Sequence, residues 1–107
     1  MPHSLDAIFR PHSVAIIGAS TRKGTIGRET LHNLLLAEFN GKVFPVNPKA
    51  TVIHSIKAYS TILDVPDAVD LAVIIVPKEQ VADVATRCGM KGVKGLVVIS
   101  AGFSETG

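Results

Sequence analysis

A glycine-rich loop near the start of this sequence combines free backbone groups with basic side chains, as an anion-binding site would. The loop follows an apolar run at 14–17 and precedes a helical pattern that begins at residue 26. A glycine-rich turn before a helix leaves backbone N–H groups facing a phosphate, and the helix dipole favours the same negative charge. The loop residues that we expect to hold the anion are Gly18, Ser20, Arg22, Lys23, Gly24 and Thr25.

A second group of candidates follows the next apolar run, where Asn47 and Lys49 stand. A dinucleotide site would instead carry an Asp or Glu there for the ribose hydroxyl, and G-x-G-x-x-G after the first strand. In this chain Gly18, Gly24 and Gly27 give the spacing G-x5-G-x2-G. The cations favour a nucleotide-like ligand that presents more phosphate than NAD does. An NADP-binding domain remains an alternative.

Alternating strand and helix patterns would position both groups of residues. Strands separated by crossover helices form a parallel sheet with right-handed connections. We therefore predict an α/β fold with a Rossmann-like parallel sheet, strand order 3-2-1-4-5 and helices on both faces. The expected strands are 14–17, 42–48, 56–60 (short), 71–77 and 95–102; the expected helices are 26–39, closed by Asn40-Gly41, 78–90 and a short turn at 4–10.

The ligand crevice of such a sheet lies at the carboxyl ends of its strands. The last two long strands of this chain end in small or turn-forming residues, which let a ligand approach the backbone. These ends add Val76, Pro77, Ser100, Ala101 and Gly102 to the candidate site.

Composition restricts the class of protein. The chain has 107 residues, of which 47% are hydrophobic, and a net charge of +2, which is too small to indicate a nucleic-acid surface. No apolar run approaches the roughly 20 residues that span a bilayer. Cys88 is the single cysteine, which we interpret as a small buried hydrophobe. We expect one cytoplasmic domain that binds neither nucleic acid nor membrane.

Four motifs in order carry a family resemblance: SVAIIGAS, KVFPVNPK, DLAVIIVP and KGLVVISAGFSETG. Together they resemble the N-terminal CoA-binding domain of nucleoside-diphosphate-forming acyl-CoA synthetases. That family includes the ADP-forming acetate–CoA ligases and is related to the alpha subunit of succinyl-CoA synthetase. The resemblance extends from Leu5 to Gly107.

The resemblance implies that CoA lies across the carboxyl ends of the strands. Ser20 and the backbone of 18–25 would hold the phosphates, and Lys49 would face the phosphorylated ribose. Residues 75–77 would flank the adenine, and 100–102 would line the route of the pantetheine arm. The residue types by themselves predict phosphate contacts at the loop and at Lys49. They do not predict where the adenine or the thiol lies.

The reaction implied for the parent enzyme interconverts acyl-CoA, ADP and phosphate with a carboxylic acid, CoA and ATP. It passes through acyl phosphate and phosphohistidine intermediates, and the phosphorylated histidine of the family belongs to a later domain. Neither His32 nor His54 matches it, and the sequence offers no paired carboxylates or metal-ligand spacing. We therefore assign no catalytic and no metal-binding residue.

We interpret residues 1–107 as a single CoA-binding domain and as the N-terminal fragment of a longer chain, inactive alone. Its expected partners are CoA or acyl-CoA and the remaining synthetase domains or subunits. A bare sheet edge would also favour self-association. The alternative role is a regulatory domain that senses CoA or acyl-CoA for a protein lysine acetyltransferase.

Overall fold

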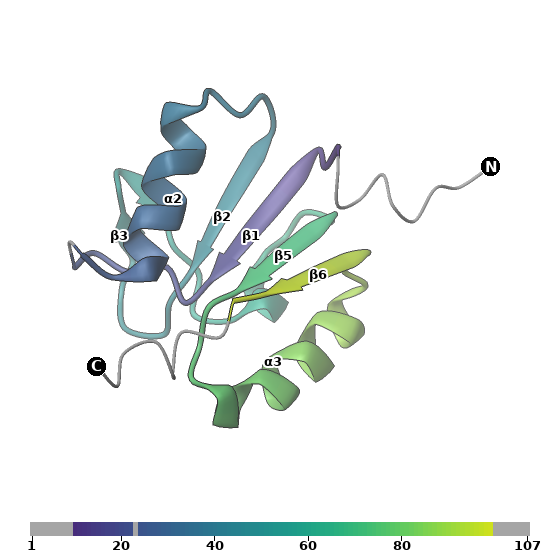
Figure 1. Cartoon of the computed structure of the whole chain (residues 1–107). Coiled ribbons are helices and arrows are strands. Elements are labelled where there is room, and N and C mark those ends of the chain that lie inside the picture. The colour runs from purple at the N-terminus through teal and green to yellow at the C-terminus, as the bar shows by residue number, and fades with distance from the viewer. Residues whose placement is uncertain (1–9, 23, 100–107) are drawn as a thin grey trace.

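A four-stranded parallel sheet forms the centre of the molecule. The computed structural model describes residues 10–22 and 24–99. Its sheet has the order β2-β1-β5-β6 (Figure 1). Ile17 lies opposite Val46 of β2 and Ile74 of β5, so these strands end at one common edge. The strands are β1 (Ser13–Ile17), β2 (Lys42–Val46), β5 (Leu71–Ile74) and β6 (Gly95–Val98).

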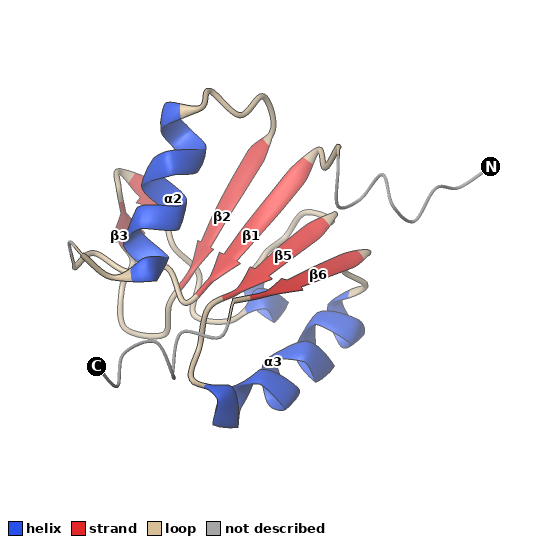
Figure 2. Ribbon diagram, viewed as in Figure 1, coloured by secondary structure: helices blue, strands red, loops and turns tan. Residues whose placement is uncertain are grey.

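Helices cover both faces of the sheet, as predicted. Helix α2 (Ile26–Leu36) lies on one face, and α3 (Lys78–Lys91) lies with the short 3-10 helix η1 (Ile62–Asp64) on the other (Figure 2). Alternate residues of β1 enter two separate cores: Ile16 packs with Leu31 of α2, and Ile17 packs with Cys88 of α3. All of β1 is buried. This two-sided burial explains the unbroken apolar run.

The predicted strand at 56–60 is not a member of the sheet, so the order 3-2-1-4-5 is not confirmed. Two short strands, β3 (Val52–Ile53) and β4 (Ile56–Lys57), instead pair with each other as an antiparallel hairpin. Within residues 24–99, Tyr59 alone bridges this segment to β2: its N–H donates to Pro45 O at 2.9 Å, and its carbonyl accepts from Asn47 N–H at 2.8 Å. The backbone groups that a fifth strand would have used to pair with the sheet are paired within the hairpin instead.

Pro45 is tolerated inside β2 because its backbone groups face away from the neighbouring strand β1. Its carbonyl oxygen points toward Tyr59, away from β1, whereas the carbonyl of Val46 accepts from Gly18 N–H. Since the N–H and C=O of one strand residue point the same way, the N–H that proline lacks would also have pointed away from β1. The β1–β2 ladder therefore loses no hydrogen bond.

Both long helices end at other residues than predicted. Helix α2 ends at Leu36 rather than at residue 39, and Glu38, with φ 58°, takes a left-handed conformation shortly after it. Helix α3 ends at Lys91, one residue later than predicted, and its C-cap Gly92 has φ 91°. The predicted turn at 4–10 falls almost wholly outside the described residues. No helix in the described part of the chain is long and apolar enough to cross a bilayer.

Candidate functional site

The turn after β1 brings the backbone of three strands together. Gly18 has φ 102°, and its N–H donates to Val46 O at 3.0 Å; on the other side Ile75 N–H donates to Ile17 O at 2.7 Å. A Cβ atom on Gly18 would lie 1.9 Å from Ile75 O. Both the dihedral angle and the close approach therefore require glycine at this position.

Helix α2 begins directly above this turn. A Cβ on Gly27, in its first turn, would lie 2.0 Å from Gly18 O, so the helix N-terminus is held against the loop. The first N–H groups of a helix have no intrahelical acceptor, and with the helix dipole they favour an anion. The predicted helix terminus over a glycine turn is thus present.

Two predicted hydroxyl ligands serve the loop itself. Thr25 is the N-cap of α2: its Oγ1 accepts from Arg28 N–H at 3.3 Å and donates to Arg22 O at 2.8 Å. Ser20 Oγ accepts from Arg22 N–H at 3.0 Å, which leaves its own proton free to donate. These contacts leave Ser20, rather than Thr25, as the hydroxyl able to reach a phosphate.

Asn47 joins the two candidate loops. Its Nδ2 donates to Ala19 O at 2.7 Å, and its Oδ1 accepts from Lys49 N–H at 2.7 Å. Both polar atoms of the amide are thereby engaged, so the side chain fixes the glycine loop relative to the Lys49 turn. We expect Asn47 to position the site rather than contact the ligand.

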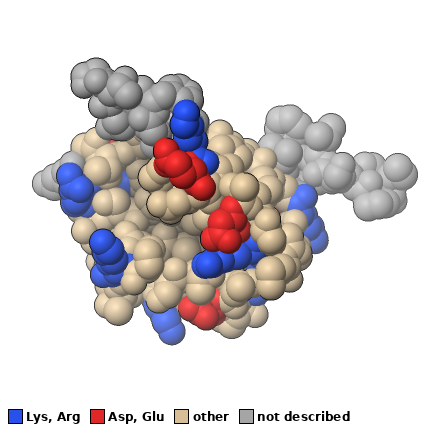
Figure 3. All heavy atoms as spheres, turned by 90° about the horizontal axis from the view of Figure 1, so that it is seen from below, with Lys and Arg blue, Asp and Glu red and all other residues tan. Residues whose placement is uncertain are grey.

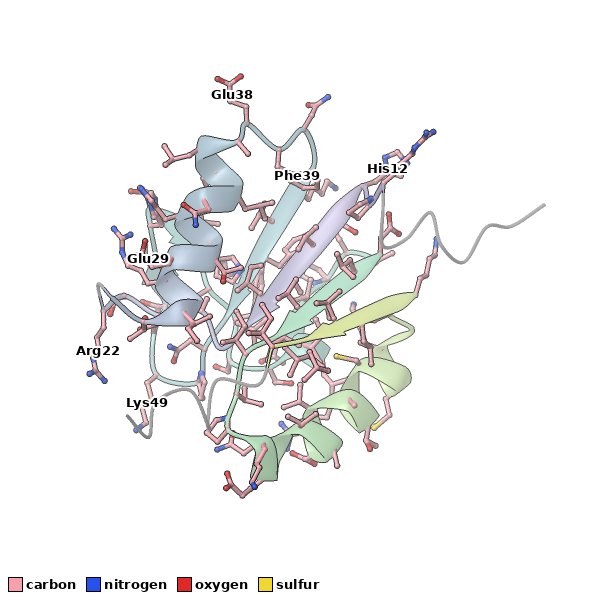
Figure 4. The ribbon with its side chains drawn as sticks, viewed as in Figure 1. His12, Arg22, Glu29, Glu38, Phe39 and Lys49 are labelled. Carbon is pink, nitrogen blue, oxygen red and sulfur yellow. The ribbon has the colours of Figure 1, made fainter. Side chains whose placement is uncertain are left out.

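The basic side chains project from the same end of the molecule. Figure 4 shows Arg22 and Lys49 at the end where β1 and β2 terminate, whereas Glu38 and His12 lie at the opposite end. Arg22 and Lys49 are exposed. Viewed from that end, Lys and Arg side chains are spread over a largely uncharged surface with a few acidic residues among them (Figure 3).

A cavity of about 350 Å³ opens beside Gly18, on the α3 side of the sheet. It includes the predicted Val76, which is buried, and its walls are mainly apolar. Most of its lining was not among the predicted site residues: Pro48 and Ser60 end expected strands but were not selected, and no strand end marks the others. The missed residues are Pro48, Ser60, Thr61 and Ile62, together with Gln80, Asp83, Val84 and Arg87 of α3.

Five of the other predicted residues lie beside this edge or outside the residues that the structure describes. Pro77 is exposed and is the N-cap of α3, where it makes no side-chain cap hydrogen bond. Lys23 and residues 100–102 (Ser100, Ala101, Gly102) are outside the described residues.

Reactive groups are scarce in the described chain. Cys88 is fully buried, and burial raises the pKa of its thiol above the ordinary value, which keeps it protonated. Within residues 10–22 and 24–99, no three His, Cys, Asp or Glu side chains converge as a metal cage would. The arrangement can bind an anionic, partly apolar ligand.

Known proteins of two kinds resemble this chain. The ADP-forming acetate–CoA ligase of Methanocaldococcus jannaschii is 52% identical over 105 residues, which are 98% of this chain but 15% of the ligase. The apo dinucleotide-forming acetyl-coenzyme A synthetase 1 of Ca. Korarchaeum cryptofilum superposes with TM-score 0.88 at 47% identity, covering 96% of this chain and 22% of that one. A conserved hypothetical protein from Pyrococcus furiosus superposes with TM-score 0.77 at 30% identity, covering 84% and 76%.

The chain thus spans less than a quarter of the length of the ligases that it matches. The CoA binding domain family matches it over residues 12–106, nearly its whole length. The glycine turn, the helix terminus and the adjoining cavity all lie inside that match, and the chain belongs to the CoA binding domain family.

Proposed function

We propose that this chain binds CoA at the carboxyl edge of its sheet and is the CoA-binding module of an ADP-forming acyl-CoA synthetase. The observation that carries the proposal is the Gly18 turn, where the N-terminus of α2 and an apolar cavity meet at one edge. CoA has both parts that such an edge would take, a diphosphate and a flat apolar base. Membership of the CoA binding domain family supports the same ligand.

The diphosphate would lie over the glycine loop. There the α2 terminus supplies N–H groups and Ser20 a hydroxyl, with Arg22 and Lys23 adding positive charge and Gly24 keeping the loop open. Lys49, held by Asn47, would meet the 3′-phosphate of the ribose. These residues would supply affinity for charge without contacting the acyl group.

The adenine would enter the cavity beside Gly18. Its volume of about 350 Å³ is at the lower end for small-molecule pockets. Val76 and Ile62 would contact the faces of the base, with Pro77 at the mouth. Polar side chains at the rim, such as Thr61 and Gln80, are able to reach ring nitrogens. The pantetheine arm would then run toward Ser100, Ala101 and Gly102.

The chemical step would require the rest of a synthetase. Two of the ligases that this chain resembles are several times its length. We propose that the complete protein interconverts acyl-CoA, ADP and phosphate with a carboxylic acid, CoA and ATP, in the cytoplasm. This chain would supply the CoA site only, and would show no acyl-CoA synthesis by itself.

A calorimetric titration with CoA, 3′-dephospho-CoA, NAD and NADP tests the proposal. CoA should bind, and loss of the 3′-phosphate should weaken it. Lys49→Ala should weaken the binding of CoA by about fivefold, or about 1 kcal/mol, and leave the binding of 3′-dephospho-CoA unchanged. The matched control is Lys94→Ala, because Lys94 pairs with Asp70 at 3.5 Å where β6 begins, at the opposite edge. Binding of NADP without CoA would overturn the assignment.

A regulatory role is the second candidate. The conserved hypothetical protein from Pyrococcus furiosus supports this candidate, because this chain covers 76% of that solved chain, which is therefore far shorter than the ligases. A CoA-sensing module should distinguish acyl-CoA from free CoA by affinity. The same titration with acetyl-CoA decides: at least a tenfold difference supports sensing, and equal affinities support a simple substrate site.

A further inference from the structure

Two histidine side chains from separate segments meet at the surface between α2 and the β3–β4 hairpin. His32 lies in α2, and His54 lies in the hairpin turn. Nδ1 of His32 and Nε2 of His54 are 2.9 Å apart, and the ring centroids are 5.2 Å apart. The proposed CoA site uses neither residue, and the sequence gives no reason to connect them.

The turn that presents His54 is strained. His54 has φ 56° and Ser55 has φ 67°, so both central residues of a two-residue hairpin turn are left-handed, a geometry that usually takes Asn-Gly. Each non-glycine residue costs about 1 kcal/mol or more in that conformation. Ile53, the preceding residue, is buried in the α2 core and anchors the hairpin. The packing therefore holds the His54 ring facing His32 despite the cost.

Facing imidazole nitrogens at this separation suit a transition metal ion. Zn–N bonds of about 2.0–2.1 Å in a tetrahedral site place two ligand nitrogens about 3.3 Å apart. The observed separation is 2.9 Å, so the rings need to part by about 0.4 Å to admit the ion. Imidazole is a preferred ligand of Zn²⁺, Cu²⁺ and Ni²⁺.

The carboxylate one helical turn before His32 does not join this pair. Among the described residues no three His, Cys, Asp or Glu side chains converge, and Glu29 Oε2 lies instead 4.0 Å from Arg28 Nη1. The two histidines are therefore the protein ligands that the structure offers. On the hairpin, the Lys57 ammonium lies 5.2 Å from the centroid of the Tyr59 ring and makes a cation–π contact with it.

We propose that His32 and His54 form a two-histidine surface site for a divalent transition metal ion such as Zn²⁺, with water completing the shell. Without metal, one of the two facing nitrogens carries the proton of their hydrogen bond. Metal binding moves that proton to the other nitrogen of the same ring, so that both facing nitrogens present lone pairs. The ion would fasten the hairpin to α2. Beyond the hairpin, the chain continues to Thr61 and Ile62 in the cavity wall.

The test is a titration of the tag-free chain with ZnCl₂, followed by calorimetry and by the melting temperature. The wild type should bind one Zn²⁺ and melt at a temperature that rises with Zn²⁺ concentration. Binding should be stronger at pH 7.5 than at pH 5.5, because protons compete for the ligand nitrogens. His32→Gln and His54→Gln should each remove the saturable binding, whereas Glu29→Gln should leave it unchanged.

Two control variants separate the site from general effects. His12→Gln removes an exposed histidine at the other end of the sheet and should bind Zn²⁺ like the wild type. Ser55→Gly relaxes the turn while keeping both ligands, so it should raise the melting temperature without metal and still bind. Absence of saturable Zn²⁺ binding by the folded wild type, or unchanged binding by the double variant His32→Gln/His54→Gln, would overturn the proposal.

Discussion

Replacing Gly18 by alanine tests the geometry that brings the strand ends together. The new Cβ would lie 1.9 Å from Ile75 O, over 1 Å closer than an ordinary contact, at a residue with φ 102°. Left-handed backbone costs alanine about 1–2 kcal/mol. Relief of the clash would weaken the hydrogen bonds from Gly18 N–H to Val46 O and from Ile75 N–H to Ile17 O, each worth about 1 kcal/mol. We expect a total loss of about 3–4 kcal/mol in unfolding free energy.

Gly24→Ala is the matched control. Gly24 also has a positive φ, 86°, but a Cβ there would meet nothing within 4 Å. This variant should lose only the conformational part, about 1–2 kcal/mol. Urea unfolding followed by circular dichroism measures both. Equal losses in the two variants would refute the reasoning, because the difference of about 2 kcal/mol between them is assigned to the contact with Ile75.

Three further perturbations follow from the same structure. Thr25→Ala removes the N-cap of α2 and should lower the unfolding free energy measured with urea by about 1 kcal/mol. A loss near zero would show that water replaces the cap. Because burial raises the pKa of Cys88, the unfolded chain releases the thiol proton first as the pH rises. The contribution of this thiol to the unfolding free energy should be constant below about pH 8.5 and then fall by up to about 1.4 kcal/mol per pH unit, and Cys88→Ala should lack this component in urea unfolding at pH 7.5 and 10. Val98 is 48% exposed on the edge strand β6, so light scattering should detect self-association that Val98→Lys reduces; a monomer at high concentration would contradict this.

The sequence predicted those parts of the site that depend on local chemistry. The Gly18 turn and the α2 terminus follow from residue types within a single strand–loop–helix unit, and the structure contains both. The buried character of Cys88 follows in the same way from helical spacing. In each case the determining contacts lie close in the chain or repeat with the period of one element.

The remaining features depend on packing between distant segments. Thr61 and Gln80 reach the cavity only because η1 packs against α3, which no local pattern encodes. The segment 56–60 has the composition of a strand, but Ile56 and Lys57 pair within a hairpin, which leaves Tyr59 to bridge β2. The same hairpin brings His54 to His32, twenty-two positions away.

The position of CoA on the protein is the claim to test most directly. A titration of the ¹⁵N-labelled chain with CoA, followed by amide chemical shifts, maps the contact residue by residue. We expect shifts concentrated at 18–27, 46–49, 60–62 and 76–80, with little change at His12 or Lys42, where β1 and β2 begin. Shifts clustered at those strand starts, or none at saturating CoA, would contradict a CoA site at the carboxyl edge.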